Sequence, residues 1–205
     1  MKQTAKAEGF TLLELMLVLA LIGILLTLGS LGTSATLRDW QMQRASQQVV
    51  EDFKAAQLQA ERHGDTTLLN GTLQEQRSFL VFDPSHNSYA LYHWQDNNSN
   101  GIPDADESNR LWNHTLPPGT SFGWVAGLDR KACSNPAGIP DRAVTFATPD
   151  SPPCNDRPCI KLDSQGSSVI GPGAIYLSNN EQSYALSITR AGLFTLCKWN
   201  GETWQ

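Results

Sequence analysis

The chain has 205 residues, of which 40% are hydrophobic and 17% are charged, and its formal net charge is -5 at neutral pH. Even without its apolar N-terminal run, this length suffices for one globular core rather than two. The acidic balance argues against a surface that neutralises nucleic-acid phosphates, and removing the first nine residues, with Lys2, Lys6 and Glu8, makes the charge -6.

An apolar run extends from Phe10 to Leu31 and contains a single charged residue, Glu14. At about 1.5 Å per residue it reaches about 33 Å as a helix, enough to cross a hydrocarbon core of about 30 Å. We therefore predict a transmembrane helix over residues 10–32. Lys2 and Lys6 precede it, and the positive-inside bias places the N-terminus in the cytoplasm and the rest of the chain on the other side of the membrane.

A secretory signal peptide is the alternative interpretation of this run, and Ser34 and Ala35 offer small residues near a cleavage point. Two features oppose it: the run is longer than the usual apolar region of about 7–15 residues, and a carboxylate near its start has no use there. Since an ionisable group in an apolar layer is costly, Glu14 is predicted to be functional.

Residues 9–15, Gly-Phe-Thr-Leu-Leu-Glu-Leu, resemble the leader junction of type IV pilins and of type II secretion pseudopilins. In that family a prepilin peptidase cuts after the glycine and methylates the new N-terminal phenylalanine, and the glutamate four residues on supports assembly. The resemblance implies a leader peptide over residues 1–9, cleavage between Gly9 and Phe10, N-methylation of Phe10, and Glu14 as the assembly residue.

The charges at this junction fit that role. The new α-amino group at Phe10 would be a cation at the membrane edge, and Glu14 of a neighbouring subunit can neutralise it. Gly23, Gly29 and Gly32 would let helices approach closely. The partners expected from the resemblance are other pilins or pseudopilins, prepilin peptidase and an inner-membrane assembly platform. Many major pilins have a proline in this helix, whereas the first proline here is Pro84.

A second helical pattern follows the apolar run. Apolar residues recur at spacings of three and four at positions Met42, Ala45, Val49, Phe53, Ala56 and Ala60. The pattern predicts an amphipathic continuation of the helix over residues 33–63, ending at His63 with Gly64 as its stop. A separate anchor followed by an ordinary core helix is the alternative, with residues 32–34 as the weak point.

Beyond Gly71 the pattern changes to short β-like runs separated by Pro, Gly, Asn and Asp. These runs are 78–82, 89–94, 143–147, 160–162, 174–177, 184–188 and 193–199. We predict a periplasmic β-rich domain over residues 64–205 with mostly antiparallel sheet. The expected fold class is α+β, one long N-terminal helix packed on antiparallel strands, and this order of elements resembles the pilin fold.

The acidic segment 96–107 fits the calcium-loop pattern D-x-[DN]-x-[DN]-G-x5-E, with Gly101 at the bend. Its candidate Ca²⁺ ligands are Asp96, Asn98, Asn100, Asp104, Glu107 and the carbonyl of Ile102. Pro103 and the strand-like flanks exclude an EF-hand domain. A polar Asn/Gly hairpin that binds nothing is the alternative, because these residues are common in turns.

This loop and the last strands also resemble the GspH/FimT branch of minor pilins and pseudopilins. The matching C-terminal stretch runs from Ser187 to Cys197 and includes an Arg-Ala-Gly turn at 190–192. Leu193 and Thr195 stand where some competence-linked relatives have basic residues, so DNA uptake is not favoured.

The four cysteines are Cys133, Cys154, Cys159 and Cys197, an even number that suits an oxidising compartment. Closure of the short loop between Cys154 and Cys159 would leave Cys133 to pair with Cys197, but four cysteines allow three connectivities and the spacing does not choose. A zinc site is the rival interpretation. The pattern is not C-x2-C, and no histidine follows His114, which argues against zinc.

Four histidines, His63, His86, His93 and His114, are scattered, and no nucleophile elbow, zinc-protease motif or P-loop organises them. We expect no enzyme. The predicted function is structural: a minor pilin that joins or primes a type IV pilus. The alternative is the H-type minor pseudopilin of type II secretion, which shares fold and processing. A calcium-dependent adhesive module on the filament is a hypothesis of a different class.

Overall fold

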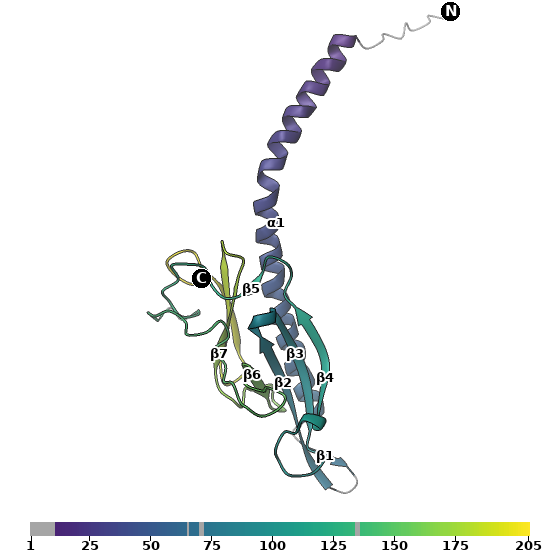
Figure 1. Cartoon of the computed structure of the whole chain (residues 1–205), viewed down its shortest axis with the longest axis vertical. Coiled ribbons are helices and arrows are strands. Elements are labelled where there is room, and N and C mark those ends of the chain that lie inside the picture. The colour runs from purple at the N-terminus through teal and green to yellow at the C-terminus, as the bar shows by residue number, and fades with distance from the viewer. Residues whose placement is uncertain (1–10, 65, 70–71, 134–135) are drawn as a thin grey trace, which may run out of the picture. The chain divides into compact units, whose positions relative to one another are not determined.

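The computed structural model describes residues 11–64, 66–69, 72–133 and 136–205, with side chains for these residues except 28–35, 66–69 and 72–74. The fold is α+β, an N-terminal helix packed on two antiparallel sheets, as predicted and consistent with a pilin fold (Figure 1). The chain divides into two compact units, residues 1–40 and residues 41–205.

The elements follow one another in the order helix and then strands. They are α1 (Leu12–His63), β1 (Thr66–Leu69), β2 (Thr72–Asp83), η1 (Pro84–His86), β3 (Ser88–Gln95), η2 (Ala105–Glu107), β4 (Ser108–Thr115), β5 (Ser121–Phe122), β6 (Cys159–Leu162), β7 (Gly173–Ser178), β8 (Ser183–Ile188) and β9 (Phe194–Lys198). The helix ends where the sequence predicts, because Gly64 adopts a left-handed conformation (φ 68°) and its N–H donates to the Ala60 carbonyl at 3.1 Å.

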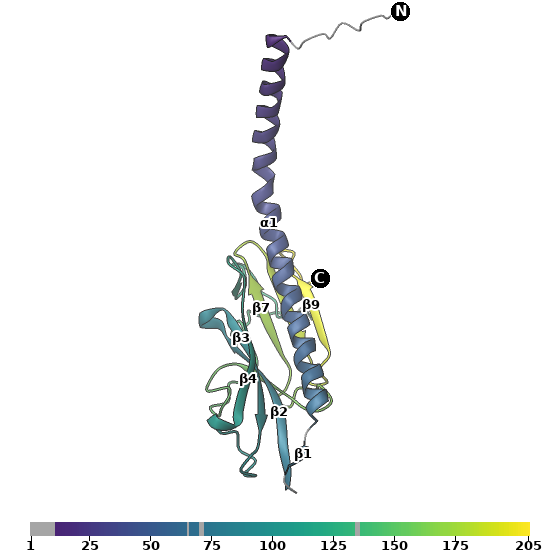
Figure 2. The same ribbon diagram turned by 90° about the vertical axis from the view of Figure 1, so that its right-hand side faces the viewer.

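The strands form two separate antiparallel sheets. The first has the order β1-β2-β3-β4, with β6 also paired to β2, and the second has the order β5-β7-β8-β9. Strand β2 is long enough to serve two partners on one edge: its first residues pair with β1, and Ser78–Val81 pair with β6. Figure 2 shows both sheets against the second half of α1.

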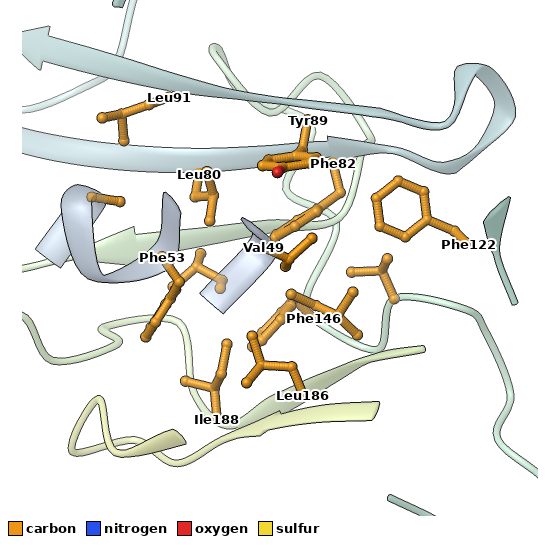
Figure 3. Close-up of a cluster of buried hydrophobic side chains, with 14 of the residues drawn as sticks. Val49, Phe53, Leu80, Phe82, Tyr89, Leu91, Phe122, Phe146, Leu186 and Ile188 are labelled. Atoms are coloured by element: carbon orange, nitrogen blue, oxygen red, sulfur yellow. The ribbon is translucent and has the colours of Figure 1, made fainter. Parts of the chain in front are cut away.

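The core lies where α1 meets both sheets. All six apolar positions of the predicted helical stripe are at most 3% exposed. Val49 and Phe53 lie between the strands of the first sheet, with Leu80 and Phe82, and those of the second sheet, as Figure 3 shows. From the second sheet the core receives Ile175, Leu177, Leu186 and Ile188. One helix face therefore holds the two sheets together.

Each sheet is also covered on its other face. In β2, Phe79 and Val81 point away from the helix and pack on Trp94 and the Cys154–Cys159 disulfide. In the second sheet, Tyr176 packs with Trp199, Trp204 and other residues in a separate apolar cluster. Because successive side chains of a strand point to opposite faces of the sheet, neighbouring residues pack in different apolar clusters.

One predicted strand is wrong. Residues 143–147 make a single bridge, Val144 to Ile175, instead of a ladder, although Val144 and Phe146 are buried. The segment runs along the edge of β7, where the Thr145 N–H donates to the Ala174 carbonyl and the Tyr176 N–H to the Ala143 carbonyl. Its apolar alternation arises because every second residue is buried against the core. A loop that covers a sheet edge shows this pattern as well as a strand does.

Replacing Phe53 tests whether the helix face is the centre of stability. Phe53 is fully buried, so Phe53→Ala is expected to lower the free energy of unfolding by about 3–5 kcal/mol, because it removes the ring and leaves a cavity. Leu58, 47% exposed on the same helix, is the matched control, and Leu58→Ala should change stability by about 0.5 kcal/mol or less. Denaturant unfolding measures both variants. An equal loss of unfolding free energy in the two would contradict the conclusion that the buried helix face dominates the stability.

Candidate functional site

Helix α1 begins at Leu12, so the predicted assembly residue Glu14 lies in its first turn. Thr11 precedes α1, and its hydroxyl oxygen accepts the backbone N–H of Glu14 at 3.3 Å, while its carbonyl accepts the N–H groups of Glu14 and Leu15. Thr11 is therefore the N-cap. We did not predict this cap, although Thr-x-x-Glu is the sequence signature of a capping box.

The large apolar side chains that follow are exposed in the described part of the chain. The large side chains from Leu12 to Leu26 are between 45% and 78% exposed, on every side of the helix. A helix that is apolar all round is one that other apolar groups bury. Glu14 is the only acidic residue of the first turn.

The cleavage site Gly9–Phe10, the methylation site Phe10 and the leader 1–9 lie outside the described residues. The predicted membrane span 10–32 lies partly outside them as well, since its side chains from residue 28 onward are not described. Within the part that the structure describes, no helix combines the length and the apolarity needed to cross a membrane.

The acidic loop between β3 and β4 is organised around two buried carboxylates, Asp96 and Glu107, each 4% exposed. Asp96 accepts the backbone N–H groups of Asn100 at 3.0 Å and of Gly101 at 2.8 Å. Glu107 accepts those of Asn97 at 2.9 Å and Asn98 at 3.1 Å, and its second oxygen accepts the Trp94 indole N–H at 3.2 Å. The two carboxylates therefore fix the loop backbone.

The remaining candidate calcium ligands also bond to one another. The side-chain amides of Asn98 and Asn100 donate to Asp104 at 2.9 and 3.3 Å, and the Ile102 N–H donates to the Asn100 side-chain oxygen. Thus the structure brings the six predicted ligands into one loop, with the Asp96, Asp104 and Glu107 carboxylates already accepting hydrogen bonds. Among the described residues, no group of three or more His, Cys, Asp or Glu could hold a metal ion. Calcium binding stays a prediction.

The four cysteines form two disulfides, Cys133–Cys197 and Cys154–Cys159. Sequence spacing left three connectivities open, and the structure selects the one with a local loop. Cys133–Cys197 ties the loop after β5 to strand β9, and Cys154–Cys159 closes the segment that covers the outer face of β2.

Asp52 of α1 is a polar partner for both β3 and β4. It accepts the hydroxyl of Tyr89 and pairs with Nδ1 of His114 at 2.7 Å. Burial, together with the hydrogen bond to Asp52, raises the pKa of Tyr89, so the phenol stays protonated and keeps donating. His114 stacks on Trp112 with ring centroids 4.8 Å apart. These groups hold the helix on the first sheet.

His63, the last residue of α1, packs against His93 of β3 with ring centroids 4.4 Å apart and ring planes inclined by 37°. Nδ1 of His93 is buried and has no hydrogen-bond partner among the residues that the structure describes. Burial, and then the neighbouring His63, lowers the pKa of His93. The neutral imidazole is therefore the form that the folded chain prefers.

Gln57 joins α1 to two turns of the β region. Its amide nitrogen donates to the carbonyls of Gly166 and Gly192, both at 2.9 Å. Gly192 closes the β8–β9 turn with a left-handed backbone (φ 76°), and an added Cβ would lie 2.4 Å from the Gly166 oxygen. The Arg-Ala-Gly turn singled out in the sequence is thus a packing contact of the helix.

Residues 4–30 match the prokaryotic N-terminal methylation motif. The motif indicates a type IV pilin-like N-terminus that prepilin peptidase processes, in agreement with the resemblance of residues 9–15. Neither curated proteins nor solved structures gave a match. The motif supports membrane anchoring at the N-terminus and association with other pilins.

The His63–His93 contact predicts a pH dependence. Because the folded pKa of His93 lies below the unfolded value of about 6.5, the unfolded chain binds the proton more readily. The corresponding stability is complete above about pH 6.5 and is lost as the pH falls through the folded pKa. His93→Gln should flatten this part of a melting-temperature profile between about pH 5 and 8. His86→Gln, at an exposed site, should leave this part of the profile unchanged. An unchanged slope in His93→Gln would show that His93 is not the group whose protonation lowers the stability.

The loop carboxylates predict a second effect. Glu107→Gln keeps the shape but removes the charge that accepts three N–H groups, so stability in EDTA should fall by about 1–3 kcal/mol. Asp106→Asn, at an exposed position of the same loop, should change it by about 0.5 kcal/mol or less. Thermal unfolding measures both variants.

Calcium is tested on the same loop by titration. If the loop binds Ca²⁺, millimolar calcium should raise the melting temperature of the wild type and not that of Asp104→Asn. No rise in the wild type would mean that the carboxylates serve the loop backbone alone.

Proposed function

We propose that the chain is a minor pilin of the GspH/FimT family, which joins or primes a type IV pilus after prepilin-peptidase cleavage and N-methylation. The observation that carries this proposal is the methylation motif over residues 4–30. The exposed apolar surface from Leu12 to Leu26 supports it, because a helix of this kind needs lipid or neighbouring helices around it.

The assembly chemistry rests on two charges. Cleavage after Gly9 would create an α-amino group at Phe10, and Glu14 lies one helical turn further along. A carboxylate in the apolar layer is costly until it finds a cation, and the amino group of a neighbouring subunit supplies one. The pair would therefore favour assembled subunits over isolated ones.

The proposed location is the inner membrane, with the N-terminus in the cytoplasm and the β domain in the periplasm. Lys2 and Lys6 favour this orientation. Two disulfides are suited to the oxidising periplasm. In this proposal the chain is a structural subunit and not an enzyme.

The H-type minor pseudopilin of type II secretion is the second candidate, because it shares the motif and the fold. Deletion of the gene separates the two. Loss of surface pili with normal protein secretion would support the type IV pilin, whereas normal pili with a lost secretome would support the pseudopilin.

Glu14→Ala tests the assembly role in the deleted strain. The variant should be cleaved and methylated at Phe10, as mass spectrometry of the mature N-terminus would show, but should not restore pili, because the neighbouring amino group loses its counter-charge. Wild type and Thr11→Ser, which keeps the capping hydroxyl, are the controls. Full restoration of both pili and secretion by Glu14→Ala would contradict the proposed role of Glu14.

A further inference from the structure

The unit formed by residues 41–205 contains a cavity of about 780 Å³ beside the second sheet. It lies between residues 131–132 and 136–141, the start of β7 and the end of β8. Its walls are Lys131, Ala132, Pro136, Pro140, Asp141, Thr145, Pro172, Gly173, Ala174, Tyr176, Ser187, Ile188, Thr189 and Arg190. The volume is within the range of about 300–1,000 Å³ that is usual for small-molecule sites.

The loop wall of this cavity is fixed by contacts at several points. The Cys133–Cys197 disulfide ties it to β9, and the Trp204 indole N–H donates to the Arg130 carbonyl at 3.0 Å. The backbone N–H of Ala132 donates to the Tyr176 hydroxyl at 2.8 Å. A wall held in this way costs a ligand little ordering entropy.

The charges of the lining favour an anion. Lys131 and Arg190 are its two cations, and among the described residues neither side chain forms a salt bridge. Asp141 is the one acidic residue among the described lining residues, which leaves them a net charge of about +1. A single negative charge matches this balance, whereas a polyphosphate would meet the Asp141 carboxylate.

Tyr176 adds a neutral donor to the same wall. Its oxygen accepts the Ala132 N–H, and among the described residues the Tyr176 hydroxyl donates no hydrogen bond of its own. Burial raises the pKa of Tyr176, and the phenol remains protonated at neutral pH. The three prolines, the alanines and Ile188 give the rest of the lining an apolar character.

We propose that this cavity is a binding site for a small organic carboxylate with an apolar body. Lys131 and Arg190 hold the carboxylate, and the prolines with Ala174 and Ile188 contact the body. The site adds a ligand-binding function to the filament subunit and does not depend on how the N-terminus assembles.

Calorimetric titration of the full chain in non-ionic detergent tests this site with 1-naphthoate as the probe. Its uncharged isostere, 1-naphthamide, and pyrophosphate are the comparison probes, and empty micelles give the blank. We expect saturable 1:1 binding of naphthoate, with both comparison probes at least tenfold weaker. In Lys131→Gln/Arg190→Gln the affinity for naphthoate should fall at least tenfold.

Two further variants keep the outcome interpretable. Arg62→Gln/Arg110→Gln removes two exposed cations outside the lining and should leave the affinity unchanged. Ser187→Trp fills the cavity without changing its charge and should abolish binding even if the double charge variant unfolds. Absence of saturable binding, equal affinity for naphthamide, tighter binding of pyrophosphate, or an unchanged affinity in a folded Ser187→Trp protein would each overturn the proposal.

Discussion

The second half of α1 has to bury one apolar face against two sheets at once, and the β region is built around that requirement. Phe53 and Val49 contact side chains from both sheets, so neither sheet closes the core without the helix. Each strand that faces the helix contributes every second side chain to this core. The side chains between them lie on the other face of the sheet, where other residues have to bury them. The loop closed by Cys154–Cys159 and the cluster around Trp204 supply it.

Two polar residues on the same helix determine how the sheets sit on it. Asp52 bonds to Tyr89 and His114 of the first sheet, while Gln57 bonds to two turns next to the second sheet. Apolar contacts tolerate small sliding, but hydrogen bonds of this length do not. These contacts therefore add positional specificity to a core that hydrophobic burial stabilises.

The proposed assembly and ligand-binding functions use different parts of the sequence. The methylation motif and Glu14 lie in residues 4–30, where the described large apolar side chains are exposed. The proposed carboxylate site lies in residues 131–190, inside a unit with its own core and disulfides. Because the two parts use separate residues, each function can be removed by mutation without the other.

Local patterns determined much of this protein. The helical stripe, the stop at Gly64 and most strands follow from neighbours one to four residues apart, because local backbone geometry fixes those periods. The methylation motif is a local match of residue types over residues 4–30. Only the tertiary structure decided the pairing of Cys133 with Cys197, the split into two sheets, the failure of 143–147 to form a strand and the closure of the acidic loop by its own N–H groups. The first three depend on contacts between residues far apart in the chain, since the same apolar alternation serves a strand or a loop that covers one. The closure of the acidic loop joins residues only four to ten positions apart, but the D-x-[DN]-x-[DN]-G pattern fits backbone N–H groups and a metal ion alike.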